Sequence, residues 1–522
     1  MMTFGDLVRR NGAHWPHKDA FVELDRRITW GELDRRTDAL GAGLRKLGVK
    51  SGDRVAVLAN DCIEVAETFL ACAKIGAIRV GLNARLAAAE VASLIKDCQP
   101  TVVFHTGEHQ RVVDLIKPDL GALPQPPILI GFGASHSAPH DYDEMIAKFG
   151  RDAALEQTPY DVAMIAYTSG STGLPKGAIY PHDKFLRTIF YTAMYEGLDH
   201  DTVWLQAMPA AGVPMMHMLR NIFYAATCVI VGPWNAERAL TLMARERTTN
   251  CVLVPTMLAS LLTIENVRSY DVSAMRLLGY GASPLPPATI REAMQTFGCP
   301  FLQMYGTTEL LGMSNMLFPS DHQLGLTSRP EILSSIGRPL SYVDTRIVDD
   351  DNKDVPIGEV GELVVRSDVA FPGYWKAPEK TAEMFFGDWM RTGDLARRDS
   401  DGYVYLSDRA KFRMKTGGFN VFPTEIENVL AEHPAVHEVS VFGLPDPTWG
   451  DRIEAVVSLK PNESIDPEDL RAFCKDKIAN FKIPKKVEIW TELPKGATGK
   501  ILKRLIIETM IARNPDDTTG QS

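Results

Sequence analysis

The sequence predicts an α/β fold, with a large N-terminal domain built of α/β sheet subdomains and a small α+β C-terminal domain. The chain has 522 residues, more than the roughly 250–300 at which single hydrophobic cores stop growing, so at least two domains are expected. Strand-like and helix-like segments alternate in its first part, which is typical of sheets whose parallel strands are joined by helices. Around residue 400 the segments become short and mixed, which indicates a separate domain of roughly 110 residues.

The alternation begins at residues 54–60 (RVAVLAN), a bounded β-branched run that predicts a strand. Apolar residues then recur at helical spacing over 62–75, and Gly76 suits the position just past the end of that helix. The pattern continues with a strand over 78–82, a helix over 88–98, and strands over 101–104 and 162–167. Because open α/β sheets bind their ligands beyond the carboxyl ends of such strands, a site is expected after the last of them.

The C-terminal part is marked by DSDG at 399–402, which predicts a turn between two short strands, the second of them at 403–406. Beyond residue 411 the pattern predicts helices over about 424–432 and about 467–478, and strands near 436–442 and 453–459.

Composition and charge favour a cytoplasmic enzyme. The formal net charge is −10, whereas a nucleic-acid-binding protein would normally carry a basic surface. The seven cysteines are scattered and never reach C-x-x-C spacing, which predicts buried free thiols in a reducing compartment. The N-terminus has no apolar signal segment, and no apolar run reaches the roughly 18 residues that span a bilayer.

The strongest candidate for a ligand-binding segment is TSGSTGLPKG at 168–177, directly after a predicted strand. Its backbone amides, hydroxyls and single lysine are suited to wrapping an anion. The register differs from G-x-x-x-x-G-K-[ST], because Lys176 follows Pro175 and precedes Gly177. The alternative is a flexible Gly/Ser surface turn, which the position after a buried strand disfavours.

Two clusters suit the base, the phosphates and the metal ion of a nucleotide. YGTTE at 305–309 combines an aromatic ring, hydroxyls and a carboxylate, and Mg²⁺ commonly uses one or two protein carboxylates together with phosphate oxygens. GYGAS at 279–283 is another glycine-rich strand end. Taken alone, neither short cluster decides between a nucleotide site and an ordinary strand end.

Two further clusters suit a ribose and a catalytic cation. RTGDL at 391–395 and SDRAK at 407–411 place an aspartate and an arginine on a predicted hairpin; the alternative is a surface ion pair worth roughly 0–1 kcal/mol. PKGATGK at 494–500 presents Lys500 on a glycine-containing loop, and as an isolated feature this is more simply an exposed lysine. HTGEH at 105–109 matches H-x-x-E-H, but Gly107 interrupts the helix that a zinc site of this kind needs, so we predict no metal there.

Together and in this order, the clusters resemble the adenylate-forming superfamily, which includes acyl-CoA synthetases, firefly-type luciferases and peptide-synthetase adenylation domains. The resemblance extends from Phe4 to about Ile507. It rests on YTSGSTGLPKGA (167–178), YGTTE (305–309), TGDL (392–395), SDRAKFRMKTGGFNVFPTEIE (407–427) and PKGATGKILKR (494–504). With no carrier domain after the last motif, the chain is most similar to stand-alone acyl-CoA synthetases, such as CoA ligases of long- and medium-chain fatty acids or of aryl acids.

The resemblance implies two reactions at one site, with ATP, Mg²⁺ and coenzyme A. A carboxylate oxygen attacks the α-phosphate of ATP, which releases pyrophosphate and gives an acyl-AMP; a thiolate then attacks the acyl carbon and expels AMP. The resemblance also implies an ATP- and acyl-binding domain at 1–408, a hinge at 409–411 with Lys411 as hinge residue, and a mobile C-terminal domain at 412–522 that rotates between the two reactions.

The family motifs imply a role for each matching nucleotide-binding residue. The β- and γ-phosphates would be held by Thr168, Ser169, Gly170, Ser171, Thr172, Gly173 and Lys176. The adenine slot would be formed by Gly281, Ala282, Ser283 and Tyr305, with Gly306 and Thr307 in the same nucleotide-binding stretch. Thr308 would reach the α-phosphate, Glu309 would bind Mg²⁺, and Asp394 and Arg409 would hold the ribose.

The catalytic residues implied by the resemblance are Lys500, Glu309, Thr172 and Lys415. Lys500 would bridge the attacking carboxylate and the α-phosphate in the first reaction. Rotation of the C-terminal domain would withdraw it and present Lys415, Gly417 and Gly418 to the thiol arm of CoA. The presence of Lys500, Glu309, Asp394 and Arg409 disfavours a non-catalytic nucleotide sensor.

The acyl pocket departs from the family pattern. Many acyl-CoA synthetases carry an aromatic–histidine pair where this chain has Ala210, Ala211 and Gly212, and a local insertion would let His217 take that role instead. No Asp or Glu lies between Met208 and Pro233, which argues against an amino-acid substrate. We therefore expect a bulky apolar acid, cyclic, aromatic or terpenoid, with a medium- or long-chain fatty acid as the alternative. A carrier-protein pantetheine in place of CoA stays open, as does a homodimer; no nucleic-acid partner and no membrane span are expected.

Overall fold

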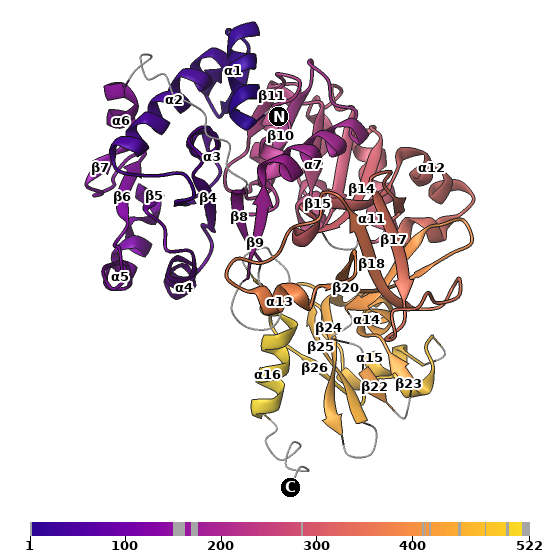
Figure 1. Ribbon diagram of the computed structural model, residues 1–522. Coiled ribbons are helices and arrows are strands. Elements are labelled where there is room, and N and C mark those ends of the chain that lie inside the picture. Colours follow the sequence, from indigo (N-terminus) through magenta and orange to yellow (C-terminus); the bar gives the residue numbers. More distant parts are fainter. Residues whose placement is uncertain are drawn as a thin grey trace. The chain divides into compact units, whose positions relative to one another are not determined.

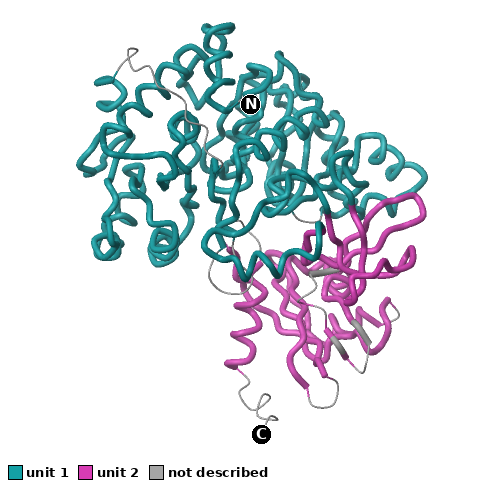
Figure 2. The backbone as a smooth tube through the Cα atoms, viewed as in Figure 1, with its two compact units in different colours: residues 1–344, 366–388 teal, residues 345–365, 389–522 magenta. Residues whose placement is uncertain are grey.

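The computed structural model describes residues 3–149, 162–168, 176–282, 285–409, 412, 414–416, 419–446, 450–475, 477–496 and 501–513 (Figure 1). They form two compact units, the first from residues 1–344 and 366–388 and the second from residues 345–365 and 389–522 (Figure 2). The predicted hinge residue Lys411 lies outside the described residues. No helix in the described ranges is long and apolar enough to cross a membrane.

The first sheet of unit 1 has the strand order β7-β6-β5-β3-β4-β8-β9. All its pairings are parallel except the hairpin between β8 and β9. Its elements are β3 (Arg54–Ala59), α3 (Ile63–Ile75), β4 (Ile78–Asn83), α4 (Ala88–Cys98), β5 (Val102–Thr106), α5 (Gln110–Gly121), β6 (Ile128–Phe132), β7 (His140–Asp141), α6 (Tyr142–Phe149), β8 (Val162–Thr168) and β9 (Lys176–Pro181). The strand–helix alternation predicted over 54–104 and the strand predicted over 162–167 are therefore confirmed. Gly76 ends α3 with a φ of 74°, a left-handed conformation that glycine adopts without strain.

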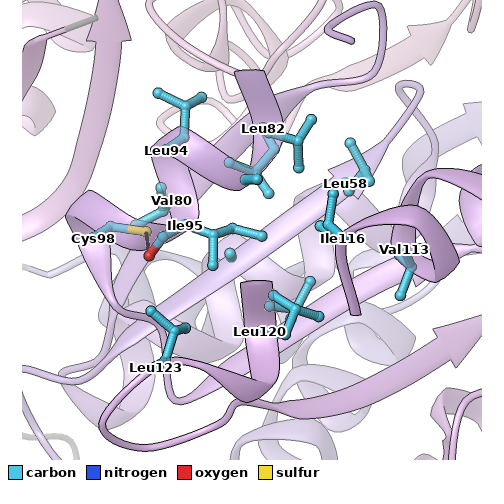
Figure 3. Close-up of a cluster of buried hydrophobic side chains, with 14 of the residues drawn as sticks. Leu58, Val80, Leu82, Leu94, Ile95, Cys98, Val113, Ile116, Leu120 and Leu123 are labelled. Atoms are coloured by element: carbon cyan, nitrogen blue, oxygen red, sulfur yellow. Dashed lines mark hydrogen bonds between the residues drawn. The ribbon is translucent and has the colours of Figure 1, made fainter. Parts of the chain in front are cut away.

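A hydrophobic core lies between this sheet and the helices α4 and α5 (Figure 3). Leu58, Val80 and Leu82 of the strands pack against apolar side chains of the two helices, among them Leu94, Ile95, Val113, Ile116 and Leu120. The Cys98 thiol lies in the same core, 3.9 Å from the Ile95 carbonyl oxygen. All seven cysteines are buried and free, as the sequence predicted.

The second sheet of unit 1 has the order β16-β15-β14-β13-β12-β10-β11-β1-β2. Its strands are β1 (Asp19–Glu23), β2 (Arg26–Thr29), β10 (Val203–Gln206), β11 (Thr227–Ile230), β12 (Asn250–Leu253), β13 (Leu277–Gly281), β14 (Phe301–Thr307), β15 (Gly312–Leu317) and β16 (Arg338–Pro339). The helices connected to it are α1 (Phe4–His14), α2 (Trp30–Lys46), α7 (His182–Tyr195), α8 (Met215–Met218), α9 (Ala236–Arg245), α10 (Pro255–Leu262), α11 (Pro287–Phe297) and α12 (Pro319–Thr327). Parallel pairing of β12, β13 and β14 brings the carboxyl ends of these strands to one edge.

A third sheet has the order β17-β18-β20-β19, with β21 beside β20. It consists of β17 (Val343–Val348), β18 (Gly361–Ser367), β19 (Phe385–Phe386), β20 (Trp389–Arg398) and β21 (Val404–Arg409). The short helix α13 (Pro378–Ala382) precedes β19. The turn predicted at 399–402 joins β20 to β21 and is confirmed.

The C-terminal part of unit 2 is a mixed α+β structure around a sheet of order β23-β22-β25-β24, with β26 beside β25. Its elements are β22 (Met414–Thr416), β23 (Phe419–Val421), α14 (Pro423–Ala431), β24 (Val436–Asp446), β25 (Gly450–Leu459), α15 (Pro467–Phe473), β26 (Lys486–Ile489) and α16 (Lys503–Arg513). The predicted α+β class, the helix at 424–432 and the two strands are confirmed. The second helix ends at Phe473 rather than near 478, because the chain there turns toward a short 3₁₀ segment at Asn480–Lys482 that leads into β26.

Candidate active site

The glycine-rich segment is the loop of the β8–β9 hairpin. Thr168 at the end of β8 pairs with Lys176 at the start of β9, and the Thr168 hydroxyl donates to the Lys176 carbonyl oxygen at 3.5 Å. The antiparallel pairing therefore fixes both ends of the loop at the edge of the first sheet. The predicted residues within the loop, Ser169, Gly170, Ser171, Thr172 and Gly173, lie outside the described residues.

Lys176 and Glu309 both contact the same buried tyrosine. The Tyr374 hydroxyl donates to Glu309 Oε1 at 2.6 Å. The Lys176 ammonium lies 5.1 Å from the centroid of the Tyr374 ring, within the distance at which a cation is attracted to the face of an aromatic ring. Burial and the adjacent Glu309 carboxylate raise the pKa of Tyr374, so its hydroxyl stays protonated and donates. The structure thus brings together two predicted site residues through a third that the sequence did not reveal.

The segment at 371–375 (FPGYW) holds this arrangement through its backbone. The Phe371 N–H donates to the Glu309 carbonyl oxygen at 2.8 Å, and the Trp375 N–H donates to the Gly177 carbonyl oxygen at 2.7 Å. Tyr180 of β9, fully buried, donates its hydroxyl to the Thr308 carbonyl oxygen at 2.9 Å. These bonds connect the base of the glycine-rich loop to the end of the YGTTE segment, although the two lie far apart in the sequence.

The carboxyl ends of β13 and β14 are shaped by glycines and by a left-handed residue. A Cβ at Gly281 would lie 2.4 Å from the Met304 carbonyl oxygen, and one at Gly306 would lie 1.9 Å from the Gly312 carbonyl oxygen, so neither position has room for a side chain. Ala282 has a φ of 70°, a conformation that non-glycine residues adopt at a cost. Tyr305 is half-buried in β14 beside these residues, whereas Ser283 lies outside the described residues.

Thr307 carries a polar atom that suits a ligand. Its side-chain oxygen is buried and makes no hydrogen bond to any described residue. A buried hydroxyl left unpaired costs roughly 1–3 kcal/mol, and an external acceptor at this strand end would remove that cost. The chemistry at this edge therefore fits a phosphate-bearing ligand.

In unit 2, Asp394 and Arg409 are directly paired. The sequence predicted the two residues on one hairpin, and in the structure Asp394 of β20 lies opposite Arg409 of β21. Asp394 is 5% exposed, and its backbone N–H donates to the Thr392 hydroxyl at 3.1 Å. The side chain of Arg409 lies outside the described part of the structure.

The residues expected to act in the C-terminal domain are described only in part. Lys415 lies in β22, opposite Asn420 of β23, but its side chain is outside the described set. Lys500, Gly417 and Gly418 lie outside the described residues altogether. Lys495 and Ile501, which flank Lys500 in the sequence, form an isolated antiparallel bridge.

The predicted acyl-pocket residues follow β10. Ala210 is fully buried, Ala211 and Gly212 are half-buried, and a Cβ at Gly212 would meet no atom within 4 Å. His217 in α8 is buried and stacks on Trp204, with ring centroids 5.8 Å apart and an interplanar angle of 5°. Burial, and secondarily Arg220, lowers the pKa of His217 well below its usual value, so its ring is neutral. Burial and stacking on Trp204 are typical of a histidine in a hydrophobic core.

Residues 208–233 contain no acid, but a carboxylate from another segment binds their backbone. Asp61, just beyond β3, accepts a hydrogen bond from the Ala210 backbone N–H at 2.8 Å. HTGEH, in contrast, is divided between β5 and a 3₁₀ turn at Gly107–His109, so its histidines do not share one helix.

Comparison with known protein families gives a match over most of the chain. The model of the AMP-binding enzyme family matches residues 8–375, and that of the AMP-binding enzyme C-terminal domain matches residues 425–500. The chain belongs to the AMP-binding enzyme family. The predicted resemblance is confirmed, and this AMP-binding enzyme is an AMP-forming acid–thiol ligase, a class that uses ATP, Mg²⁺ and CoA.

Similar proteins cover the AMP-binding enzyme almost from end to end. A feruloyl-CoA synthase of an Amycolatopsis species is 34% identical over 94% of this chain and 95% of its own. The fatty acid–[acyl-carrier-protein] ligase ScoC of Streptomyces coeruleorubidus is 32% identical over 97% of this chain and 96% of its own. Among solved structures, the anthranilate CoA ligase AuaEII in complex with anthranoyl-AMP is 28% identical, with a TM-score of 0.87, and covers 98% of both chains.

The AMP-binding enzyme offers a donor set that fits Mg²⁺ with a nucleotide. Glu309 supplies a carboxylate, Lys176 an ammonium group bound to the same tyrosine, and Thr307 an unpaired buried hydroxyl. A single protein carboxylate beside phosphate-binding groups is the usual arrangement for Mg²⁺, which takes its remaining ligands from phosphate and water.

Proposed function

We propose that the chain activates a bulky, apolar carboxylic acid with ATP and transfers the acyl group to the thiol of CoA. In the first reaction a carboxylate oxygen bonds to the α-phosphorus, the bond from the α-phosphorus to the bridging oxygen breaks, and pyrophosphate leaves. In the second, the CoA thiolate bonds to the acyl carbon and AMP leaves. The observation that carries the proposal is the Lys176–Tyr374–Glu309 cluster, which joins the glycine-rich hairpin to the YGTTE segment.

The roles of individual residues follow from this arrangement together with the family motifs. Mg²⁺, when bound, supplies positive charge to the phosphate oxygens. Lys176 would stabilise the departing pyrophosphate, with Thr168 and Thr172 of the same hairpin. Glu309, held in place by Tyr374, would bind the metal ion, while Thr308 would reach the α-phosphate. Tyr305 would stack on adenine beside Gly281 and Ala282, and Asp394 with Arg409 would hold the ribose.

The second reaction is proposed to follow a rotation of residues 412–522 about the hinge at 409–411. The charge of Lys500 would then leave the site, and Lys415, Gly417 and Gly418 would approach the thiol arm. Both reactions need stabilisation of developing charge, for which a preorganised donor is worth about 10²–10³ in rate. The same site therefore needs one set of charge-stabilising donors for adenylation and another set for thioester formation.

Replacing Lys411 with proline should uncouple the two reactions, because proline fixes φ near −65° and so restricts the rotation. We expect one half-reaction to continue near its normal rate and the other to fall by at least about tenfold. ATP–pyrophosphate exchange and thioester formation from supplied acyl-AMP measure the two separately. Normal turnover in Lys411→Pro would remove this residue as the hinge.

The preference for a bulky apolar acid is supported by the loop after β10. Ala210 and Ala211 carry only methyl groups, and a Cβ at Gly212 would meet open space. The similarity to a feruloyl-CoA synthase and an anthranilate CoA ligase agrees with a ring-bearing acid.

Pyrophosphate release with a panel of acetate, octanoate, benzoate, cinnamates and cyclic terpenoid acids tests the preference for a bulky apolar acid. We expect kcat/KM for the best ring-bearing acid to exceed that for acetate by at least about 100-fold, since each added methylene in an apolar pocket contributes roughly 1–3 kcal/mol. A preference for acetate would contradict the wide pocket.

A carrier protein is the second candidate acceptor. The similarity to the fatty acid–[acyl-carrier-protein] ligase ScoC favours it. Both acceptors present the same thiol, so a chase of preformed acyl-AMP with either CoA or a phosphopantetheinylated carrier protein separates them.

A further inference from the structure

The backbone of the loop after β10 is held by two buried, oppositely charged side chains, Asp61 just beyond β3 and Arg79 in β4. The Ala210 N–H donates to Asp61 Oδ1 at 2.8 Å. Arg79 Nη1 donates to the carbonyl oxygens of Ala210 at 3.0 Å and of Ala211 at 3.3 Å. Gln206, at the end of β10, donates from Nε2 to Asp61 Oδ2 at 3.2 Å. Both polar groups of Ala210 are thus bound by charged side chains from distant parts of the sequence.

A glycine in β4 permits this close approach. Gly81 lies two residues beyond Arg79 and so on the same face of the strand. A Cβ at Gly81 would lie 2.0 Å from the Ala211 carbonyl oxygen and 2.4 Å from Arg79 Nη1. The absent side chain leaves the space through which the guanidinium of Arg79 passes to reach the loop.

Holding a loop with two buried charges costs free energy of desolvation. Arg79 is 1% exposed and Asp61 is 9% exposed. Removing a charge from water costs several kcal/mol, so such a pair adds little to stability but defines a geometry. The loop itself has only small side chains at Ala210, Ala211 and Gly212, which cannot fix its position by packing. Hydrogen bonds hold its backbone instead: Asp61 and Arg79 bind its centre, the Gln206 amide donates to the Met208 carbonyl oxygen, and the Met215 N–H donates to the Gly212 carbonyl oxygen.

The held loop also forms one side of a small polar pocket. Asp61 and Ala211 both line it, together with Asn60, Pro209 and Trp234, and its volume is about 20 Å³. A shift of the loop away from Asp61 would therefore change the space on this side of the backbone.

We propose that Asp61 and Arg79 are positioning residues that fix the backbone of 208–212 and thereby set the width of the acyl pocket. The inference rests on the proposed function, in which this loop lines that pocket. Neither residue is expected to touch the reacting atoms. They act through the peptide groups of Ala210 and Ala211.

The charge on Asp61 gives the arrangement a pH dependence. Burial raises the pKa of Asp61 to about 6, opposed by the hydrogen bonds from Ala210 and Gln206 and by the charge of Arg79, and assisted by Glu23; Cys228 is the other titratable neighbour. A raised pKa means that the folded chain binds this proton more tightly than the unfolded chain. The corresponding stability is present below pH 3.8 and is lost as the pH rises through about 6. Conversely, the attraction between Asp61 and Arg79 weakens as the pH falls through the same value.

The test compares Asp61→Asn and Arg79→Met with Glu67→Gln as a matched control. Glu67 is also a buried carboxylate in unit 1, bound by Arg36 Nε at 2.6 Å and by the Tyr142 hydroxyl at 2.6 Å, but neither bond involves the loop. In ATP–pyrophosphate exchange over acids of increasing size, both loop variants should raise KM for the best acid by about tenfold or more, because Asp61→Asn removes the charge that strengthens the bond from Ala210 and Arg79→Met removes both donors to the loop carbonyls. They should also change the order of preference. KM for ATP should stay within about twofold, and Glu67→Gln should keep the wild-type preference while it lowers Tm.

Three further readouts separate a positioning role from loss of folding or of activity. Gly81→Ala keeps both charges but pushes on the Ala211 carbonyl, so it should alter acid preference as well. The wild-type KM for the acid should change with an apparent pKa near 6, a dependence absent from Asp61→Asn. Hydrogen exchange at 208–212 should be faster in Asp61→Asn than in Glu67→Gln.

If exchange is faster but the wild type activates no acid, the proposed function fails, while the role of Asp61 in fixing the backbone of 208–212 stands. Unchanged exchange and unchanged acid preference in the folded variants would overturn the inference.

Discussion

Lys500→Ala is expected to lower adenylate formation by about 10²–10³-fold while thioester formation from supplied acyl-AMP stays near the wild-type rate. The reason is that charge builds between the attacking carboxylate and the α-phosphate only in the first reaction. An ammonium group placed there neutralises it, and alanine removes that charge without replacing it. The bridge between Lys495 and Ile501 uses backbone groups of residues that the substitution does not change, so Lys500→Ala should leave that bridge in place.

The measurement is ATP–pyrophosphate exchange with the preferred acid, beside a CoA chase of synthetic acyl-AMP. Lys495→Ala is a matched control, because this lysine lies in the same segment but forms an ion pair with Glu438 Oε1 at 2.9 Å. It should leave both half-reactions close to normal. Equal loss of the two half-reactions in Lys500→Ala would contradict the model in which the C-terminal domain presents one face to each reaction.

Glu309→Gln is expected to lower adenylation by about 10²–10³-fold, with an increased requirement for Mg²⁺. The side-chain oxygen of glutamine can still accept the hydrogen bond that the Tyr374 hydroxyl donates to Glu309 at 2.6 Å. What it removes is the negative charge that binds the metal ion. Titration of pyrophosphate exchange with Mg²⁺ should therefore show a higher half-saturating concentration, not only a lower maximum.

Tyr374→Phe tests how much activity depends on the position of the Glu309 carboxylate, because it removes the hydrogen bond to Glu309 without changing the charge of Glu309. It retains the ring beside Lys176 and removes only the hydroxyl, so we expect a smaller loss, about tenfold, as for one hydrogen bond to a charged group. Glu379→Gln, at an exposed carboxylate of α13, controls for the loss of one negative charge. An unchanged Mg²⁺ requirement in Glu309→Gln would exclude this carboxylate as the metal ligand.

The parts of the fold that could be predicted are those in which the signal is local. β3, α3 and β4 follow from the periodicity of their own apolar residues, and the pairing of Asp394 with Arg409 follows from a turn between two strands. The pairing of β1 with β11 could not be predicted in this way, because the paired residues are more than 200 positions apart in the sequence. Neither strand has a residue pattern that identifies which strand lies beside it.

The same distinction applies to the site. The glycine-rich hairpin and YGTTE are continuous segments whose residue types indicate their chemistry. Tyr374, Asp61 and Arg79 are single residues whose contacts exist only after folding, and each resembles an ordinary core or surface residue in the sequence. Asp61 could not be found among residues 208–233, because it comes from a segment almost 150 residues away in the sequence.

The burial of all seven cysteines has a consequence for an enzyme that makes an activated acyl group. An acyl-AMP reacts with whichever thiolate reaches it, and the intended acceptor is itself a thiol. Burial raises the pKa of every cysteine in the chain, to about 12 for Cys72, Cys98 and Cys299. At neutral pH these thiols are protonated and therefore poor nucleophiles. The protein's own sulfur atoms are thus kept from competing for the acyl group, and from forming mixed disulfides with the acceptor that it must release.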